Sequence, residues 1–369
     1  MIQFTIFLLL LTLFRSVAGD TFPSTTVTGN VPVPTSSSDS PFDGPKIGAV
    51  NSTAFDWWYF DAVSHQGDSQ ITIVFYRAAG LFDDPVPSVN YIEVTITFPN
   101  GTSFDTFFFG TTSEVTTNGE GASGNWDGTG ASFEGKADLS KYTIQIQNDV
   151  VMGHLTIESI APAHYPDGSG AGASDTSTTV SPGLQWDNAI PAGKANCHFT
   201  VYGEVFEFYD GVGYHDKNWG GLSITETITS WYWGHATLGP FSLVWFDLIS
   251  SVTGTRYSST YLVKHGKVLL AGQATPYSAS SDFGIVVPYG NGTTYPPANS
   301  QQPAGFLINF IGNDGRIWSF LTQNVAVALD TSEGGLDGYT RWCGIVTGGE
   351  VGGEVASGSG VWEWLRLYP

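Results

Sequence analysis

The sequence predicts an all-β protein, and three observations support this fold class. Short runs rich in β-branched and aromatic residues recur along the chain, as β-strands favour. Turn segments rich in glycine separate these runs, and the chain of 369 residues contains 46 glycines. No long segment combines a 3.6-residue apolar period with helix caps. Many short strands joined by such turns are typical of β-sandwiches and β-barrels.

The first 19 residues have the layout of a secretory signal peptide. An almost unbroken apolar run from Phe4 to Phe14 is followed by Arg15 and by a small-residue site that ends at Gly19. The apolar run is too short to span a bilayer, and no later segment holds 18 consecutive apolar residues. We therefore predict cleavage after Gly19, export into the secretory pathway or out of the cell, and no insertion into the membrane.

The remaining chain is long enough for two domains. Residues 20–45 form a Ser/Thr/Pro-rich tract without apolar periodicity, which we interpret as a flexible leader. The strand signals follow it, and the second and third of them form a hairpin around a turn at Pro99-Asn100-Gly101. In chain order, the main expected strands are Ile71–Tyr76, Tyr91–Phe98, Phe104–Phe109, Tyr142–Ile146, Phe199–Phe208, Leu243–Ile249, Ser258–Val263, Phe306–Ile311, Ile317–Leu321 and Val361–Leu367.

Cysteines and glycosylation sequons agree with an exported chain. Cys197 and Cys343 are the two cysteines, and two lone cysteines in an exported protein usually pair, so we predict a disulfide between them. The sequons at Asn51, Asn100 and Asn291 are predicted glycosylation sites. The last two lie in an expected hairpin tip and a Pro-rich loop, where a glycan has room.

Charge and missing motifs exclude several function classes. The formal net charge is −21, so the surface repels phosphate backbones and nucleic acid is not an expected partner. The sequence has no G-x-S-x-G, H-E-x-x-H or P-loop motif, and its single G-x-G-x-x-G match follows a polar segment instead of a buried strand. The seven histidines lack metal-ligand spacing. We therefore expect neither a metal nor a cofactor.

Three segments concentrate aromatic and polar residues. In the first, a strand over 55–61 places Trp57, Tyr59 and Asp61 on one face and Trp58 and Phe60 on the other. Aromatic residues on both faces indicate burial on both sides, with a ligand pocket or a second domain on one of them. Core packing alone is the alternative interpretation.

The second segment, 211–220, packs His215, Asp216 and Asn218 between glycines, and it is either a hydrogen-bonded turn or a site. The third begins at residue 231. Trp231 and Trp233 share one strand face there, and Trp245 and Asp247 share a face of the next strand.

Together these segments resemble the carotenoid hydratase (hydroxyneurosporene synthase) type of double-lipocalin protein, a family that includes fungal Diels–Alderases. The resemblance is carried by Asp56-Trp57-Trp58-Tyr59-Phe60, Gly213-Tyr214-His215-Asp216-x-Asn218-Trp219-Gly220 and Trp231-x-Trp233-Gly234. It implies two lipocalin-like β-barrel or sandwich domains over 46–224 and 225–369, with the substrate pocket between them.

The signal peptide, the sequons and the cysteine pair are similar to those of the secreted fungal hetero-Diels–Alderases of tropolonic sesquiterpenoid biosynthesis. This resemblance implies a cofactor-free pericyclase that couples a tropolone ortho-quinone methide to a humulene-type sesquiterpene. A [4+2] addition requires no nucleophile, metal or redox cofactor, which agrees with the missing motifs. The expected partners are therefore small terpenoid and tropolone molecules.

Arg341 is the first candidate catalytic residue, because it is one of few cations and precedes Trp342. Its guanidinium group could donate two hydrogen bonds to a pair of tropolone oxygens, or it could be a structural salt-bridge partner. The expected substrate-binding residues are Trp57, Tyr59, Asn218, Trp231, Trp233, Trp245 and Trp342.

Two other functions stay open at this point. One is a terpenoid hydratase or acid-catalysed alkene cyclase, in which His215 or Asp247 donates the proton. The other is a secreted glycan-binding protein that stacks tryptophans on sugars. The surroundings of the tryptophans distinguish these functions, because a lectin exposes them on an open face and a pericyclase lines a cavity with them.

Overall fold

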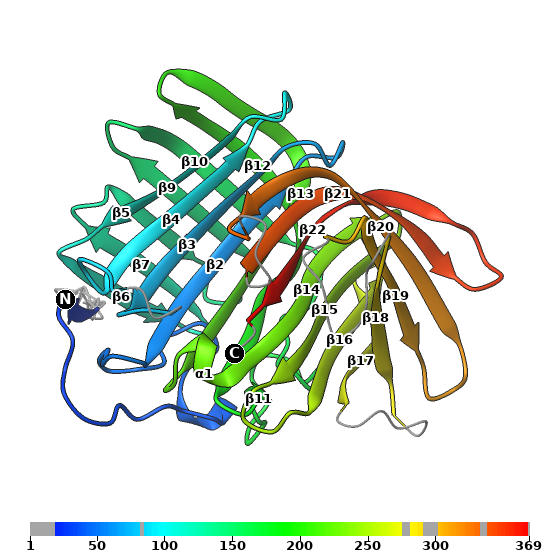
Figure 1. Cartoon of the computed structure of the whole chain (residues 1–369), viewed down its shortest axis with the longest axis horizontal. Coiled ribbons are helices and arrows are strands. Elements are labelled where there is room, and N and C mark those ends of the chain that lie inside the picture. The colour runs from blue at the N-terminus through cyan, green and yellow to red at the C-terminus, as the bar shows by residue number, and fades with distance from the viewer. Residues whose placement is uncertain (1–18, 82–84, 275–280, 291–301, 333–337, 368–369) are drawn as a thin grey trace, which may run out of the picture.

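The computed structural model describes residues 19–81, 85–274, 281–290, 302–332 and 338–367. Within them, the chain forms two antiparallel sheets that curl side by side (Figure 1). The first contains β1 Asp20–Pro23, β2 Phe55–Val63, β3 Gln70–Ala78, β4 Asn90–Thr97, β5 Ser103–Phe109, β6 Thr112–Asn118, β7 Gly121–Asp127, β8 Ala131–Gly135, β9 Lys141–Gln147, β10 Val151–Ser159, β11 Thr179–Ser181, β12 Leu184–Val201 and β13 Glu204–Gly220. The second contains β14 Ile228–Leu238, β15 Phe241–Ser250, β16 Arg256–Lys264, β17 Lys267–Ala274, β18 Phe283–Tyr289, β19 Gly305–Ile311, β20 Ile317–Asp330, β21 Gly338–Glu350 and β22 Ala356–Arg366. The all-β prediction is confirmed.

The first sheet curls around its own aromatic core. Its strand order is β1-β6-β7-β8-β9-β10-β12-β13-β2-β3-β4-β5, with β11 beside β12. Because side chains alternate along a strand, every second residue faces the inside of the curl. Trp58 and Phe60 of β2 meet Trp126 and Phe133 there, with ring centroids 5.3 Å apart for Phe60 and Phe133.

The second sheet, in the order β17-β16-β15-β14-β22-β21-β20-β19-β18, encloses a core of its own. That core contains Trp245, Trp318, Trp342 and Trp362, each at most 2% exposed. A third apolar cluster lies between the two sheets, with Tyr59 from the first sheet and Trp233, Phe246 and Leu365 among the residues from the second. Two separate cores and a shared aromatic interface therefore account for the many tryptophans.

The chain passes from the first sheet to the second between Gly220 and Ile228. A short helix, α1 (Ile224–Thr227), lies in this crossing, and Ser223 caps it. The Ser223 side chain accepts a hydrogen bond from the backbone N–H of Glu226, whose carboxylate in turn accepts the backbone N–H of Ser223. This crossing lies where the resemblance places the domain boundary, near residue 225.

Residues 20–45 are packed against the first sheet, so the expectation of a flexible leader was wrong. The strand β1 pairs with β6, the 3-10 turn η1 spans Ser37–Asp39, and Phe42 and Asp43 are fully buried. Polar contacts hold the segment to distant strands. Among them, the indole N–H of Trp219 donates to the carbonyl of Pro34 at 2.8 Å. The segment lacks apolar periodicity because these scattered contacts, and not a continuous apolar face, bind it.

The predicted disulfide between Cys197 and Cys343 is also wrong, because both thiols are free and fully buried. Cys197 on β12 belongs to the core of the first sheet, whereas Cys343 on β21 belongs to the cluster between the sheets. A disulfide needs Cα atoms within about 7 Å of each other and side chains that face one another. Strand alternation sends these two side chains into different clusters, which sequence spacing alone does not reveal.

The sequons differ in their surroundings. Asn100 is exposed at the turn between β4 and β5, as expected. The side-chain amide of Asn51 donates to the carbonyl of Gly29 at 2.9 Å, so a glycan there would compete with this bond. Asn291 and most of the predicted signal peptide, up to residue 18, lie outside the described residues. No helix in the described part of the chain is long and apolar enough to cross a membrane.

Candidate functional site

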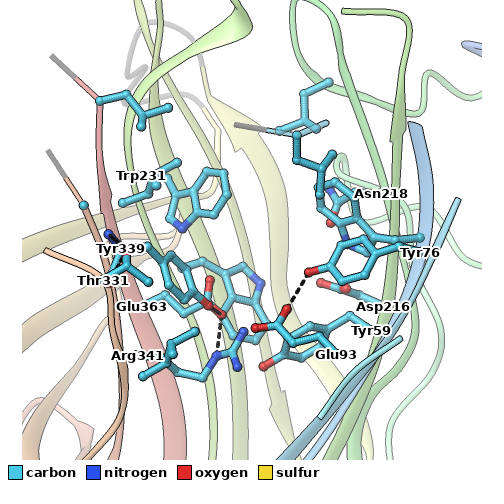
Figure 2. A pocket seen from close by; sticks show the side chains of 18 of the residues that line it. Tyr59, Tyr76, Glu93, Asp216, Asn218, Trp231, Thr331, Tyr339, Arg341 and Glu363 are labelled. Carbon is cyan, nitrogen blue, oxygen red and sulfur yellow. Dashed lines mark hydrogen bonds and ion pairs between the residues drawn. The ribbon is translucent and has the colours of Figure 1, made fainter. Parts of the chain in front are cut away.

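A cavity of about 610 Å³ lies between the two sheets (Figure 2). Strands β2, β3, β4, β5, β12 and β13 of the first sheet form one wall, and β14, β15, β20, β21 and β22 of the second sheet form the other. The lining residues are Trp57, Tyr59, Tyr76, Leu81, Val86, Tyr91, Glu93, Phe107, Phe109, Leu184, Asp216, Asn218, Trp231, Trp233, Phe246, Leu329, Thr331, Gly338, Tyr339, Arg341, Glu363, Leu365 and Leu367. Most of this surface is aromatic or aliphatic, as in sites for apolar small molecules.

The alternation predicted for 55–61 explains how the first sheet contributes to this wall. Trp57 and Tyr59 face the cavity, while Trp58 and Phe60 fill the core of the first sheet. On the neighbouring strand β13, Asn218 pairs with Trp57 and Asp216 pairs with Tyr59, so both polar residues share the cavity face. Two of the segments singled out in the sequence therefore meet through sheet register.

Aromatic contacts continue the wall across both sheets. The ring of Tyr76 stacks on that of Tyr91, with centroids 4.7 Å apart, and Trp57 meets Tyr76 edge-on at 5.9 Å. Across the interface, the ring of Trp233 lies 5.3 Å from that of Tyr59. These contacts join the rings into a continuous apolar surface that spans both sheets.

The charged centre of the cavity is Arg341 on β21. Its Nε donates to Oε1 of Glu363 at 2.9 Å, and the hydroxyl of Tyr339 donates to the same oxygen. The guanidinium carbon lies 5.3 Å from the ring centroids of both Tyr59 and Tyr339. Arg341 is 4% exposed and Glu363 is 6% exposed, so low-dielectric surroundings strengthen the attraction between them. Figure 2 shows the guanidinium group on the cavity wall, near Glu93.

Glu93 on β4 is a carboxyl group with a raised pKa. Burial raises the pKa of Glu93 to about 7, and Arg341 opposes this rise by favouring the charged form. The hydroxyl of Tyr76 donates to Oε2 of Glu93 at 2.9 Å. A carboxyl group that titrates near neutral pH can both give and accept a proton.

Asp216 on β13 is a second carboxyl group of this kind. Its Oδ2 accepts hydrogen bonds from the indole N–H of Trp186 and from the hydroxyl of Tyr214, each at 2.8 Å. Burial raises the pKa of Asp216 well above its ordinary value, although both hydrogen bonds oppose the rise. Burial therefore favours the protonated form of Asp216, and that form can donate a hydrogen bond or a proton.

The structure brings together six of the residues predicted for the site. Trp57, Tyr59, Asn218, Trp231, Trp233 and Arg341 all line the cavity. Their tryptophans line a cavity between the sheets and not a flat open face, which is the arrangement expected of an enzyme and not of a lectin. The roles of these residues stay predictions.

The other four predicted residues do not line the cavity. His215 is fully buried in the first sheet, where Nδ1 lies 2.9 Å from the carbonyl oxygen of Tyr59, Nε2 lies 3.3 Å from Asp43, and the ring stacks on Phe60. It lies next to Asp216 in sequence, but strand alternation turns it to the opposite face.

Asp247 on β15 pairs with Arg256, whose Nε donates to Oδ1 at 2.8 Å. Its strand neighbours Phe246 and Leu248 face the interface between the sheets, so Asp247 faces the other way. Trp245 shares that face, and Trp342 also packs in the core of the second sheet. Contrary to the expectation, the structure therefore places His215, Asp247, Trp245 and Trp342 away from the cavity, where they pack in the cores of the two sheets or form polar contacts there.

Sequence reasoning missed Tyr76, Glu93, Tyr339 and Glu363 as site residues, and it named Asp216 only as part of the segment 211–220. For Glu93 and Glu363, the sequence contains a pattern that could have identified them. Glu93 is the one acid within the apolar strand 91–98, and Glu363 lies between two tryptophans in 361–367. A charged residue in such a run has to be paired or functional, because burial of an unpaired charge is costly.

Within the described residues, no group of three or more histidine, cysteine, aspartate or glutamate side chains is arranged to hold a metal ion. The polar groups of the cavity lining are an arginine, carboxyl groups, tyrosine hydroxyls, the amide of Asn218 and the hydroxyl of Thr331. Such groups can polarise an oxygen atom of a bound molecule or transfer a proton to it.

Comparison with known proteins agrees with this architecture. The chain is 33% identical to the quinolone epoxide rearrangement protein penF of Penicillium thymicola, over 88% of this chain and 89% of that protein. It is 28% identical to the Diels-Alderase ffsF of Aspergillus flavipes, over 89% and 80%. The crystal structure of CghA with Sch210972 superimposes with a TM-score of 0.78 at 22% identity, covering 94% of this chain and 98% of that chain, and so shows the shared fold.

The resemblance drawn from the three sequence segments is thereby confirmed, as is the fold of two lipocalin-like barrels. The model of the family described as "Diels-Alderase-like" matches residues 19–368. The sheets, the cavity between them and this match lead to one conclusion. The chain belongs to the Diels-Alderase-like family and is an enzyme of the cyclase type.

Proposed function

We propose that the enzyme is a pericyclase that catalyses the hetero-Diels–Alder coupling of a tropolone ortho-quinone methide with a humulene-type sesquiterpene. The observation that supports this proposal is the buried guanidinium group of Arg341 on the wall of a large aromatic cavity. The aromatic surface suits a terpene, and the cation suits the oxygen atom of a quinone methide.

The chemistry requires positioning more than bond-breaking groups. Two new σ bonds form while the π electrons of diene and alkene reorganise, and no atom leaves. Holding both partners in a near-attack arrangement can contribute several kcal/mol to the lowering of the barrier. Arg341 would donate a hydrogen bond to the quinone methide oxygen, which gains electron density as its ring becomes aromatic. Exclusion of water by the apolar walls would protect the reactive partner from hydration.

A second candidate reaction is an acid-assisted rearrangement of an epoxide on an aromatic heterocycle. It is supported by two carboxyl groups with raised pKa values on the cavity wall, Glu93 at about 7 and Asp216 well above its ordinary value. Proton transfer from one of them to the epoxide oxygen would accompany cleavage of the C–O bond. The names of the relatives penF and asqO, both quinolone epoxide rearrangement proteins, also point to this chemistry.

One experiment separates the two reactions. Purified enzyme is incubated with a quinone methide released in situ plus humulene, and separately with a quinolone epoxide, and the products are resolved by chiral chromatography. The proposal expects a faster reaction and a changed stereoisomer ratio for the first pair, compared with reactions without enzyme. The second candidate would be supported if the enzyme converts only the quinolone epoxide and if Glu93→Gln or Asp216→Asn abolishes that conversion. No effect on either reaction would refute both.

We also propose that the chain enters the secretory pathway, as the apolar run before Gly19 indicates. Expression in a fungal host followed by N-terminal sequencing of the product tests this. The expected mature terminus is Asp20, and an intact Met1 would contradict the proposal.

A further inference from the structure

A buried polar pair joins the two sheets directly behind the cavity wall. Nε2 of His235 on β14 lies 2.8 Å from Oδ1 and 3.0 Å from Oδ2 of Asp61 on β2. Asp61 is fully buried and His235 is 1% exposed, and neither residue lines the cavity. Because Nε2 faces both carboxylate oxygens, it is the proton donor of this contact. The pair therefore ties a strand of the first sheet to a strand of the second.

Asp61 also holds a residue that does line the cavity. The hydroxyl of Tyr59 donates to Oδ2 of Asp61 at 2.7 Å. A phenol has one proton, so this bond uses it, and Tyr59 presents its ring and oxygen lone pairs to the cavity. The imidazole of His235 is itself fixed by Tyr214, whose ring stacks on it at 4.4 Å with an interplanar angle of 11°. Tyr59 is thus held at its distal end by an anchored pair.

The ring of Tyr59 in turn bounds the position of Arg341. The guanidinium carbon lies 5.3 Å from the ring centroid of Tyr59 and 5.3 Å from that of Tyr339. One edge of the guanidinium group is fixed by the bond from Nε to Glu363. Nη1 is buried without a hydrogen-bond partner in the described part of the chain, so ring contacts replace hydrogen bonds at that end.

We propose that Asp61 and His235 are positioning residues that act through Tyr59 on the guanidinium group of Arg341. Asp61 orients the phenol, His235 orients Asp61 from the opposite sheet, and the phenol ring keeps Arg341 directed along the cavity wall. The effect of this pair on catalysis rests on the proposed function, whereas its effect on the position of Arg341 does not.

The position of Arg341 can be measured without substrate. In protein labelled selectively with ¹⁵N-arginine, the Nε–H signal of Arg341 is assigned by its loss in Arg341→Lys. We expect Asp61→Asn, His235→Gln and Tyr59→Phe each to shift or broaden this signal. The matched control is His198→Gln, which changes an exposed histidine–carboxylate contact of 3.0 Å to Glu207. Neither residue lines the cavity, so this variant is expected to leave the signal unchanged.

Kinetics then test whether the three residues act as one unit. We expect Asp61→Asn and Tyr59→Phe each to lower kcat by roughly tenfold to hundredfold, with KM within about twofold, because misplacement affects the reaction more than binding. In the Tyr59→Phe background, Asp61→Asn is expected to cause no further loss of kcat, because the hydroxyl through which Asp61 orients Tyr59 is already absent.

An unchanged Arg341 signal in folded Asp61→Asn and Tyr59→Phe proteins would overturn the positioning role, as would kcat losses that multiply in the double variant. If Asp61→Asn does not fold, Tyr59→Phe decides alone, because it removes one oxygen atom and keeps the ring. A wild-type enzyme that converts none of the tested substrates would refute the proposed function, and the NMR measurement would still decide the role of the pair.

Discussion

Replacement of Arg341 by methionine tests the proposed chemistry most directly, because the apolar stem is kept and the charge is lost. The change affects stability as well as catalysis. Arg341 and Glu363 are 4% and 6% exposed, and loss of one partner leaves a buried carboxylate supported mainly by the hydroxyl of Tyr339. For a buried pair this typically costs about 3–5 kcal/mol of folding free energy.

The catalytic effect is estimated from the role of a single buried donor. Removing one preorganised hydrogen-bond donor to an oxygen that gains charge lowers kcat by about 10²–10³-fold, or about 2.7–4 kcal/mol. We expect Arg341→Met to show a loss in this range. Arg341→Lys is expected to recover only part of it, because a point charge does not reproduce the planar fork of a guanidinium group.

A double variant separates stability from catalysis. Arg341→Met with Glu363→Gln removes both charges, so folding stability is expected to recover while kcat stays low. Arg256→Met is the matched control, because Arg256 forms a similar pair with Asp247 on the face that points away from the cavity. This control is expected to lower the melting temperature without changing kcat or the product stereochemistry.

The assay is single-turnover formation of cycloadduct from quinone methide and alkene, resolved by chiral chromatography, with melting temperatures measured alongside. A well-folded double variant with unchanged kcat and unchanged stereoisomer ratio would refute the assigned role of Arg341. The arginine would then be only the structural partner of Glu363.

Three further predictions concern other residues. Burial raises the pKa of Glu93 from its ordinary 4.5 to about 7, so between these pH values the folded state binds more protons than the unfolded state. The free energy of unfolding should therefore fall as the pH rises through this window, by at most about 3 kcal/mol. Glu93→Gln should remove this pH-dependent loss, as measured by urea unfolding between about pH 4.5 and pH 8. Burial raises the pKa of Cys343 to about 12 and that of Cys197 well above its ordinary value, so both thiols should resist alkylation in the native protein. In denaturant without reductant, both thiols should react, as measured by intact mass. An unmodified mass under these conditions would show that the two cysteines form a disulfide. Protein secreted from a fungal host should lose mass on endoglycosidase treatment, and Asn100→Gln should abolish part of that shift; an unchanged shift would remove Asn100 from the glycosylated sites.

The sequence by itself determined the fold class and the two faces of the central strands. Period-two alternation over 55–61 placed Trp57 and Tyr59 on one face and Trp58 and Phe60 on the other, and the structure keeps this division. Alternation follows from the geometry of a single strand, so it needs no knowledge of distant residues. The scarcity of cations likewise directed attention to Arg341, which lines the cavity.

Tertiary structure decided which face of each strand meets the cavity. Trp233 and Trp245 lie on neighbouring strands of similar composition, yet the first lines the cavity and the second fills a core, because this protein buries both faces of its sheets. Tertiary structure likewise determined that Cys197 and Cys343 do not form a disulfide, because their side chains face different apolar clusters.

Long-range pairing also created chemistry that no local pattern contains. Glu93 has its raised pKa because the packed sheets bury it, and Arg341 of the second sheet opposes this rise by favouring the charged form. The contact between Asp61 and His235 joins residues 174 positions apart in the sequence. Burial, dielectric environment and hydrogen-bond partners depend on which surfaces meet, and those are properties of the packed sheets and not of any one segment of the chain.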